Sequence, residues 1–499
     1  MTKTRIKEFI LRYKHILCIL LAVFVFVTIC SQSSFIYPFN TWVDPNCFFT
    51  VARAMANGKV LYVDIYEQKG LYLYAFHIFA YGISHNSFIG VYLLQLFMGF
   101  IYGLAVYKML RLYVSEKFAL LLIPVLIMAT YVPFSYERGD SAEEFAMPMI
   151  AMSLLWLMRY SKGQKIGLCN YFAVGAFAAI IFWIKYTMLG FFFAFILLAF
   201  IFEIRDKRVK RAFLGVGLFV LGMFAASIPA LVYFISHKAL NKMFEAYIYN
   251  NIFLYSNVNA GQASNFIVKI GYILRSYVFS IGQGWSFYIP IIAGFIYFAA
   301  SKKISRREKI MLFVTYGVTV FVIYIGGVGY RYYGQPICVY AFTGGAALYA
   351  KRRKLVYAKT LDAKPAFLHI ASILMIMSVM TAVPLNSSTD LMFKKKDELV
   401  QYRFAKIINE TQDATLLNYG CLDFGVYTAA NIIPSCKYFC GLNIPLDDIK
   451  NTQDEWVKEG KVDYIVCYDV ELPDGQEKYE LIDQVDIYKL YALKERSNV

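Results

Sequence analysis

The sequence contains few histidines and no cysteine pair of the kind that binds zinc. Its five histidines are scattered, and none of its nine cysteines stands in a C-x-x-C arrangement. It also lacks a glycine-rich loop that could cradle a nucleotide phosphate, and it has neither an internal repeat nor a low-complexity tract. These absences argue against a zinc site and against a domain that binds a nucleotide-linked sugar.

Acidic residues are scarce in the first three quarters of the chain. Residues 1–384 carry 37 Lys+Arg and only 14 Asp+Glu, whereas residues 385–499 carry 13 and 20. A basic protein, here with a net charge of +16, can indicate nucleic-acid binding. The basic residues, however, stand in short segments between apolar runs, so membrane orientation explains them better. No nucleic-acid partner is expected.

Apolar residues are in excess. The chain is 59% hydrophobic and 18% aromatic, with a mean hydropathy of +0.50, whereas a soluble domain is about 45–50% apolar. The excess occurs in runs near twenty residues, the length that crosses a hydrocarbon core about 30 Å thick. The expected fold class is a polytopic α-helical membrane protein, with membrane lipids as partners.

Lysine and arginine residues predict which side of the membrane each loop faces. Several precede the first apolar run and place the N-terminus in the cytoplasm. The apolar run 71–83 would reach only about 20 Å as a helix, so we expect it to lie at the outer surface. With that choice, 27 Lys+Arg before residue 384 fall inside, among them the cluster 351–354, and 10 fall outside. Eleven spans are then expected, at 16–35, 88–112, 118–134, 145–160, 168–184, 188–202, 213–236, 287–300, 310–327, 334–350 and 367–383.

Two longer parts of the chain are expected outside. Residues 237–284 contain amphipathic stretches at 244–255 and 266–281, which we expect at the membrane surface. From residue 385 the composition changes and the pattern predicts a small α/β domain. The predicted domains are a membrane domain, 1–384, and an extracytoplasmic α/β domain, 385–499.

Within residues 385–499, two helices and three short strands are predicted. The helices are expected at 394–408 and 451–459, and the strands at 414–418, 462–467 and 488–492. The domain contains four cysteines, Cys421, Cys436, Cys440 and Cys467. Outside the cell they could form one or two disulfides, and free buried thiols are the equal alternative.

The first outer loop, 36–70, is unusually polar for a segment next to a membrane span. It contains Asp44, Asp64, Glu67 and Lys69. Ionisable residues this close to a bilayer are costly unless they face water, a substrate or a partner, so the loop is a candidate site. An ordinary solvated loop is the alternative.

Two later outer loops also carry charge. The second, 136–144, includes Arg138 and Asp140, and the third, 329–333, includes Arg331 between tyrosines. If the three loops face one cavity, a carboxylate can act as a general base. The cations can then stabilise a phosphate leaving group as negative charge develops on it.

The acidic residues also have structural interpretations. Asp44 followed by Pro45 fits the N-cap and first position of a helix that ends near residues 57–58. Ser141 and Glu144 fit a capping box, which favours a structural rather than a catalytic Glu144.

The basic residues have interpretations at the membrane interface. Lys69, and Lys185 at the outer end of a span, could snorkel. Arg331 could belong to an interfacial aromatic belt, and Arg138 could pair with Asp140.

The order of these features resembles the bacterial GT-C membrane glycosyltransferases, most closely the lipid A aminoarabinose transferase and protein O-mannosyltransferase type. After one span, the outer loop contains Trp42-Val43-Asp44, Gly58-x-x-Leu61-Tyr62-x-Asp64 and Gln68-Lys69-Gly70. Arg138-Gly139-Asp140 fits the family's second acidic position, and Arg331-Tyr332-Tyr333-Gly334-Gln335-Pro336 resembles its aromatic-rich motif. The family's acidic pair after the first span is Asp44-Pro45 here, so only Asp44 is carried over.

The resemblance implies transfer of a sugar from a polyprenyl-phosphate donor to an envelope glycan, lipid or protein on the extracytoplasmic face, with inversion. It implies that Asp44 is the general base and that Asp140 orients the site or helps to bind a metal. A divalent metal is left open, and no other cofactor is expected. The donor phosphate would be bound by Lys69, Arg138 and Arg331, and other parts of the substrates by Asp64, Glu67, Tyr332 and Tyr333.

Two other protein classes compete with this interpretation. A transporter or a lipid or polysaccharide flippase predicts ionisable residues deep within spans and often two related halves. The sequence shows neither feature. An envelope scaffold has no need for acidic and basic residues in three outer loops.

Overall fold

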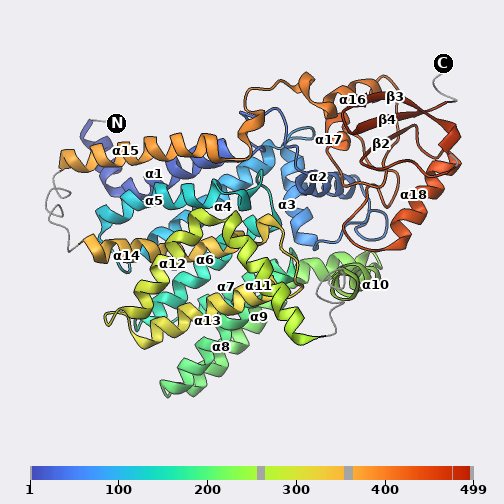
Figure 1. Cartoon of the computed structure of the whole chain (residues 1–499). Coiled ribbons are helices and arrows are strands. Elements are labelled where there is room, and N and C mark those ends of the chain that lie inside the picture. Colours follow the sequence, from blue (N-terminus) through green and yellow to red (C-terminus); the bar gives the residue numbers. More distant parts are fainter. Residues whose placement is uncertain (1–2, 256–264, 353–363, 475, 495–499) are drawn as a thin grey trace. The chain divides into compact units, whose positions relative to one another are not determined.

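The apolar runs form helices in the structure, a computed structural model that describes residues 3–255, 265–352, 364–474 and 476–494. One four-stranded sheet lies near the C-terminal end of this mainly helical chain (Figure 1). The chain divides into two units, each assembled from three segments. Unit 1 comprises residues 1–31, 93–228 and 269–389, and unit 2 comprises residues 32–92, 229–268 and 390–499.

Unit 1 is built from helices, eleven of which lie at the positions of the predicted spans. The helices are α1 (Lys3–Cys30), α4 (Ile89–Leu110), α5 (Glu116–Tyr131), α6 (Ala142–Ser161), α7 (Leu168–Phe182), α8 (Gly190–Arg205), α9 (Val209–Ser236), α11 (Phe266–Gln283), α12 (Trp285–Ala300), α13 (Arg306–Ile323), α14 (Phe342–Arg352) and α15 (Lys364–Leu385). The 3-10 segments η1 (Phe134–Tyr136), η2 (Tyr186–Met188) and η6 (Arg331–Tyr340) lie between them. The exception is α11, which lies at the predicted amphipathic stretch 266–281, and α14 covers only the second half of the span predicted at 334–350 because its first half is the 3-10 segment η6. Helices α4, α9 and α11 continue into unit 2.

Helices α12 and α14 pack closely because glycines stand where they meet. A Cβ added to Gly294 on α12 would lie 2.4 Å from the carbonyl carbon of Thr343, and one added to Gly344 on α14 would lie 2.5 Å from the carbonyl oxygen of Pro290. Small residues allow this backbone approach, as is common between membrane helices. Neither glycine can be replaced without moving the backbone.

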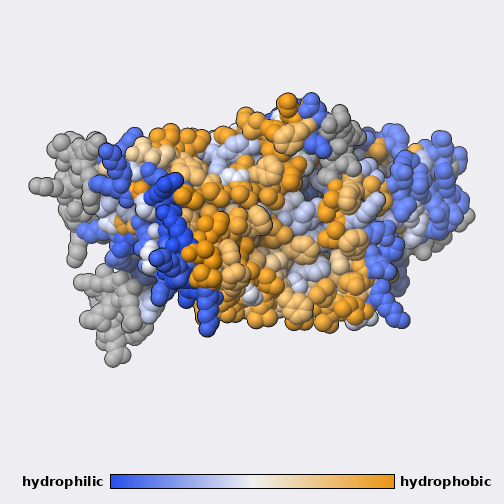
Figure 2. All heavy atoms as spheres, turned by 90° about the horizontal axis from the view of Figure 1, so that it is seen from below, coloured by the Kyte–Doolittle hydropathy of each residue, from blue (hydrophilic) through white to orange (hydrophobic). Residues whose placement is uncertain are grey.

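Outward faces of unit 1 are apolar. Helix α9 exposes Phe213, Val220 and Phe224, and helix α12 exposes Ile289 and Ile296. Figure 2 shows the apolar surface in orange. Soluble monomers rarely expose large apolar patches, so these faces fit contact with lipid.

The number of membrane spans stays a prediction. By length and composition alone, four described helical segments could cross a membrane, and helices α11 and α12, bent by 108°, would add a fifth as one span. The four are Tyr13–Cys30, Ile89–Leu110, Tyr186–Arg205 and Val209–Ser236. The side of each loop also stays a prediction, and residues 353–354 of the cluster 351–354 lie outside the described residues.

Unit 2 combines the first predicted outer loop with the C-terminal residues. Its helices are α2 (Val43–Ala56), α3 (Leu71–Ile83), α10 (Leu240–Met243), the π-helix η3 (Phe244–Leu254), η9 (Lys396–Glu398), α16 (Val400–Ile408), α17 (Val426–Ala430), α18 (Asp447–Glu459) and η10 (Gln476–Lys478), and η8 (Thr389–Leu391) lies at its boundary. The predicted helix 71–83 is confirmed.

The sheet of unit 2 has the strand order β1-β2-β4-β3. Its strands are β1 (Leu416–Asn418), β2 (Tyr464–Tyr468), β3 (Tyr479–Val485) and β4 (Tyr488–Leu493). β1 and β2 are parallel, with α18 in the crossover between them, and the other two pairings are antiparallel. The predicted small α/β arrangement is therefore confirmed.

Buried hydrogen bonds connect helix α2 to residues 423–432 of the same unit. Thr50 Oγ1 donates to Asp423 Oδ2 at 2.7 Å, and Arg53 Nη1 donates to the carbonyl oxygens of Tyr427 and Ile432. Burial raises the pKa of the Asp423 carboxyl, and it lowers the pKa of the Arg53 guanidinium to about 10. Residues separated by 373 positions in the sequence thus position α2.

Some local predictions differ from the structure. The predicted helix 394–408 is interrupted because Leu399 is extended (φ −97°, ψ 134°), which separates η9 from α16. Strand β3 and helix α17 were not predicted. All nine cysteines are free thiols, so the disulfide alternative is not what the structure contains. Cys47 Sγ and Cys440 Sγ are 3.9 Å apart.

Candidate functional site

Asp44 lies in the first turn of helix α2. The helix begins at Val43 after an extended Trp42 (φ −75°, ψ 137°), so the prediction that Asp44 is the N-cap is wrong by two residues. The Asn46 side chain secures this start by donating to the carbonyl oxygens of Asn40 (2.9 Å) and Trp42 (2.7 Å). Asp44 is half-buried, and the positive end of the helix dipole stabilises its charged form.

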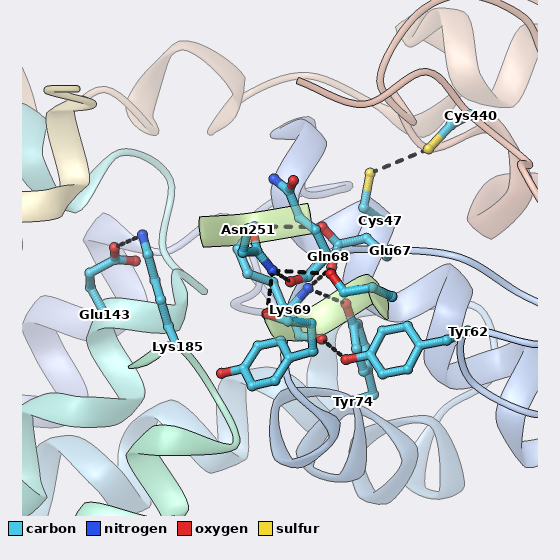
Figure 3. Close-up of polar contacts among 12 residues, drawn as sticks. Cys47, Tyr62, Glu67, Gln68, Lys69, Tyr74, Glu143, Lys185, Asn251 and Cys440 are labelled. Atoms are coloured by element: carbon cyan, nitrogen blue, oxygen red, sulfur yellow. Dashed lines mark hydrogen bonds and ion pairs between the residues drawn. The ribbon is translucent and has the colours of Figure 1, made fainter. Parts of the chain in front are cut away.

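Lys69 belongs to a polar cluster before helix α3 (Figure 3). Glu67, which is 3% exposed, accepts hydrogen bonds from the Lys69 amide (2.8 Å) and the Tyr74 hydroxyl, and its Oε1 lies 3.5 Å from Lys69 Nζ. The Tyr62 hydroxyl donates to the Lys69 carbonyl oxygen. The backbone of Lys69 is therefore held at both its N–H and its carbonyl, and the Lys69 ammonium lies 5.8 Å from the centre of the Phe48 ring.

The π-helix η3 holds the loop that precedes Lys69. Asn251 Nδ2 donates to the Gln68 carbonyl oxygen at 2.8 Å, and Asn250 Nδ2 donates to the Tyr66 hydroxyl at 3.2 Å. Burial raises the pKa of Tyr66 to about 12, so its hydroxyl is protonated at neutral pH. π-Helical turns are rare and are frequent at functional sites. This one forms the predicted amphipathic stretch 244–255.

The second predicted loop has an unusual backbone. Glu137, Gly139 and Asp140 have φ angles of 53°, 82° and 75°, all in the left-handed region. A Cβ at Gly139 would lie 2.5 Å from Ser31 Oγ and 2.8 Å from Gln95 Nε2, so only glycine fits there. Other residues in this region cost of order 1–3 kcal/mol each and persist only where their surroundings enforce them.

Glu144 enforces the conformation of this loop. Its buried carboxylate accepts hydrogen bonds from the Asp140 amide (2.9 Å), Gln95 Nε2 (2.8 Å) and the Tyr136 hydroxyl (3.0 Å). Ser141 Oγ accepts a hydrogen bond from the Glu144 amide at 3.0 Å and so caps helix α6. The predicted cap by Ser141 is confirmed, but the reciprocal half of the capping box differs, because the Glu144 carboxylate accepts from the amide of Asp140, one residue before the N-cap, and not from that of Ser141.

The second and third predicted loops meet within unit 1. Arg331 Nε lies 3.8 Å from Glu137 Oε1, and Ser135 Oγ donates to Gln335 Oε1 at 2.9 Å. The Arg331 side chain is 55% exposed, so its ion pair contributes little stability. Arg138 is half-buried.

A buried ion pair in unit 1 was not predicted from the sequence. Lys185 is 9% exposed, and its Nζ lies 2.5 Å from Glu143 Oε1 on α6 (Figure 3). The ammonium is 3.6 Å from the centre of the Tyr333 ring and 5.6 Å from that of Tyr332. The snorkelling interpretation of Lys185 is therefore wrong. The residue is extended (φ −161°, ψ 103°) between α7 and η2, and its side chain reaches α6.

The predicted site residues are divided between the two units. Unit 2 contains Asp44, Asp64, Glu67 and Lys69, and unit 1 contains Arg138, Asp140, Arg331, Tyr332 and Tyr333. Asp64 is exposed and accepts the Val60 amide at 2.8 Å, which gives it a local structural role. Convergence of all these residues on one cavity stays a prediction. Within the described part of the chain, no group of three His, Cys, Asp or Glu residues is placed to hold a metal ion.

Solved structures with a similar fold are membrane glycosyltransferases. ArnT from Cupriavidus metallidurans, solved with undecaprenyl phosphate, matches with a TM-score of 0.63 at 12% identity, over 95% of this chain and 97% of that chain. The archaeal oligosaccharyltransferase AglB from Archaeoglobus fulgidus, in complex with an inhibitory peptide and a dolichol-phosphate, matches with a TM-score of 0.52 at 11% identity, over 92% and 70%. No protein-family model and no curated protein sequence matches this chain. The likeness confirms the GT-C fold.

Proposed function

We propose that this chain is an integral-membrane glycosyltransferase that moves a sugar from a polyprenyl-phosphate donor to an acceptor of the cell envelope. The observation that carries the proposal is the likeness to ArnT, solved with undecaprenyl phosphate, over 95% of this chain. AglB, solved with a dolichol-phosphate, supports the same class of donor. A rigid backbone around Lys69 and Asp140 also supports it, because preorganised charges stabilise a transition state.

In the proposed reaction, Asp44 takes the proton of the acceptor hydroxyl. The acceptor oxygen bonds to the anomeric carbon as the bond between that carbon and the phosphate oxygen breaks. The polyprenyl phosphate leaves with the bonding electron pair, and attack from the opposite side inverts the anomeric configuration. The helix dipole at Asp44 favours its ionised form, so a charged, positioned base is present at neutral pH.

Basic residues stabilise the departing phosphate in this proposal. Lys69 contributes from a backbone that Glu67 and Tyr62 hold in place, and Arg138 and Arg331 contribute from the second and third loops. Asp140 orients the second loop or helps to bind a divalent metal. The remaining substrate contacts are assigned to Asp64, Glu67, Tyr332 and Tyr333.

The acceptor is an envelope glycan, lipid or protein on the extracytoplasmic face. This placement follows from the predicted topology, with the N-terminus in the cytoplasm and residues 385–499 outside. A lipid-linked donor also agrees with the lack of a nucleotide-binding loop in the sequence.

The proposal is tested by comparing the envelope glycans of cells with and without the gene by mass spectrometry. Loss of one defined sugar mass from a polymer, lipid or protein is expected. In parallel, protein in nanodiscs should transfer a labelled sugar from a polyprenyl phosphate to envelope material of the deletion strain. Movement of an intact lipid-linked sugar across the bilayer, with no transfer, would instead identify a flippase.

A further inference from the structure

We propose that Glu143 and Lys185 form a subsite of unit 1 that binds a sugar hydroxyl of a substrate. The proposal rests on the proposed function and adds a binding site to it. Glu143 is the second residue of helix α6, and Lys185 lies between α7 and η2. The lysine also lies against the tyrosine rings of η6.

The carboxylate of Glu143 has unused hydrogen-bonding capacity. Oε1 receives the Lys185 ammonium, whereas Oε2 is buried and has no hydrogen-bond partner among the described residues. Glu143 is only 2% exposed. Leaving a buried acceptor unsatisfied is destabilising, and more so when the acceptor is charged.

A second ion pair of unit 1 shows what a complete arrangement looks like. Glu308 is 4% exposed, Lys162 Nζ lies 3.0 Å from its Oε1, and the Lys162 ammonium is 4.2 Å from the centre of the Tyr113 ring. The Tyr113 hydroxyl donates to Glu308 Oε1 at 2.9 Å, and the Ser305 amide donates to Oε2 at 3.0 Å. Both glutamates are buried and both ammonium groups lie over a tyrosine ring, although Lys162 is exposed and Lys185 is not. Of the two carboxylates, only Glu143 keeps an oxygen without a hydrogen-bond partner among the described residues.

The chemistry of this oxygen selects the ligand. It is an acceptor, so it needs a hydrogen-bond donor, and a phosphate or an apolar chain supplies none. Lys185 already balances the charge of the carboxylate, so a neutral donor such as a hydroxyl fits better than a second cation. Tyr332 and Tyr333, with ring centres 5.4 Å apart, add aromatic faces on which the C–H groups of a sugar can pack.

Lys185 acts in this subsite as a positioning residue. Its contact with Oε1 fixes the rotation of the carboxylate and leaves Oε2 for the ligand. Its positive charge also balances the negative charge of the buried carboxylate. The sugar hydroxyl can belong to the lipid-linked donor or to a glycan acceptor, and the two sources share this chemistry.

The test compares Glu143→Gln with the matched control Glu308→Gln in nanodiscs. The probes are polyprenyl phosphates that carry a hexose or a pentose and the same polyprenyl phosphate without a sugar. If the donor supplies the hydroxyl, Glu143→Gln should raise the Kd of the sugar-bearing lipid about tenfold or more, which is the loss expected for one charge-assisted hydrogen bond. The Kd of the sugar-free lipid should stay unchanged.

A second measurement distinguishes the sources of the hydroxyl. If the acceptor supplies it, both lipid Kd values stay unchanged and the KM for the acceptor glycan rises by a similar factor. Unchanged Kd and KM values in Glu143→Gln would overturn the subsite. Equal weakening of both lipids, or the same effect in Glu308→Gln, would also overturn it.

Another variant keeps the proposal testable if Glu143→Gln does not fold. Glu143→Asp preserves the charge opposite Lys185 but withdraws the carboxylate by one methylene, so weaker binding of the sugar-bearing substrate is expected. Wild-type affinity in Glu143→Asp would overturn the subsite. A wild type that transfers no sugar would defeat the proposed function, whereas an active wild type with an unaffected Glu143 variant would defeat only the subsite.

Discussion

The substitution Asp44→Asn separates a general base from a residue that only stabilises the start of a helix. Asparagine keeps the size and most of the hydrogen-bonding capacity of the side chain but cannot take a proton at neutral pH. Asp44 is the second residue of α2 and is half-buried. The start of the helix is also secured by Asn46, so the fold does not depend on Asp44 alone.

Two magnitudes decide the expected result. Loss of a negative charge in the first turn of a helix costs about 0.3–1 kcal/mol of stability. Loss of a general base lowers the rate about 10²–10⁴-fold, which corresponds to roughly 2.7–5.5 kcal/mol in activation free energy. Asp44→Asn should therefore fold normally and retain at most about one hundredth of wild-type turnover on that scale.

Helix α18 offers a control with the same position in a helix. Asp448 is the second residue of α18 and is exposed. Asp448→Asn removes an equivalent charge from a helix that has no proposed catalytic residue. It should cost a similar small amount of stability and leave turnover unchanged.

The assay measures sugar transfer from a polyprenyl phosphate by purified, monodisperse protein, with melting temperature as the stability readout. Near-normal turnover by Asp44→Asn would reduce Asp44 to a helix-stabilising residue and transfer the base assignment to Asp140. Equal activity losses in Asp44→Asn and Asp448→Asn would show that helix stability, rather than proton transfer, is the cause.

Further predictions concern donor binding, topology and pH. Lys69→Ala should raise the Kd for polyprenyl phosphate with little change in melting temperature, because Glu67 and Tyr62 bind its backbone; an unchanged Kd would leave Lys69 only an interfacial role. In a variant without native cysteines, an impermeant thiol reagent applied to intact cells should label a cysteine at position 433 but not one at position 353, and the opposite pattern would defeat the predicted topology. Burial holds the pKa of Asp423 above its ordinary value of 3.8, so the stability that this side chain contributes is full below about pH 4 and is lost as the pH rises through the folded-state pKa. The difference in melting temperature between the wild type and Asp423→Asn should therefore shrink from about pH 4 toward neutrality, and a growing difference would contradict this sign.

Segments with a strong local signal were predictable from the sequence. The run 71–83 became helix α3 because its residues are almost all apolar and it contains no proline, and α2 ends near residues 57–58 because Gly58 takes the left-handed conformation that glycine tolerates. The capping role of Ser141 could also be predicted from the sequence, because it depends on a contact with Glu144, three positions later. Local chemistry determines all three features.

Features that depend on tertiary contacts could not be predicted. The position of α2 depends on contacts of Thr50 and Arg53 with residues that lie 373 and 374 positions away in the sequence. Strand β3 mixes apolar and charged residues without a regular alternation of burial, and it lies at the edge of the sheet, where it pairs with β4. The Glu143–Lys185 pair joins residues 42 positions apart, and no spacing rule connects them. A lysine directly after an apolar run was the one available signal, and it equally fits snorkelling.

The most direct test of the central claim is transfer of a labelled sugar from a polyprenyl phosphate by the purified wild-type protein in nanodiscs. The acceptor is envelope material from cells that lack the gene. The account predicts a labelled envelope product together with release of sugar-free polyprenyl phosphate, and loss of both in Asp44→Asn. An intact donor across a panel of hexose- and pentose-bearing lipids, with wild-type protein that still binds them, would contradict the account.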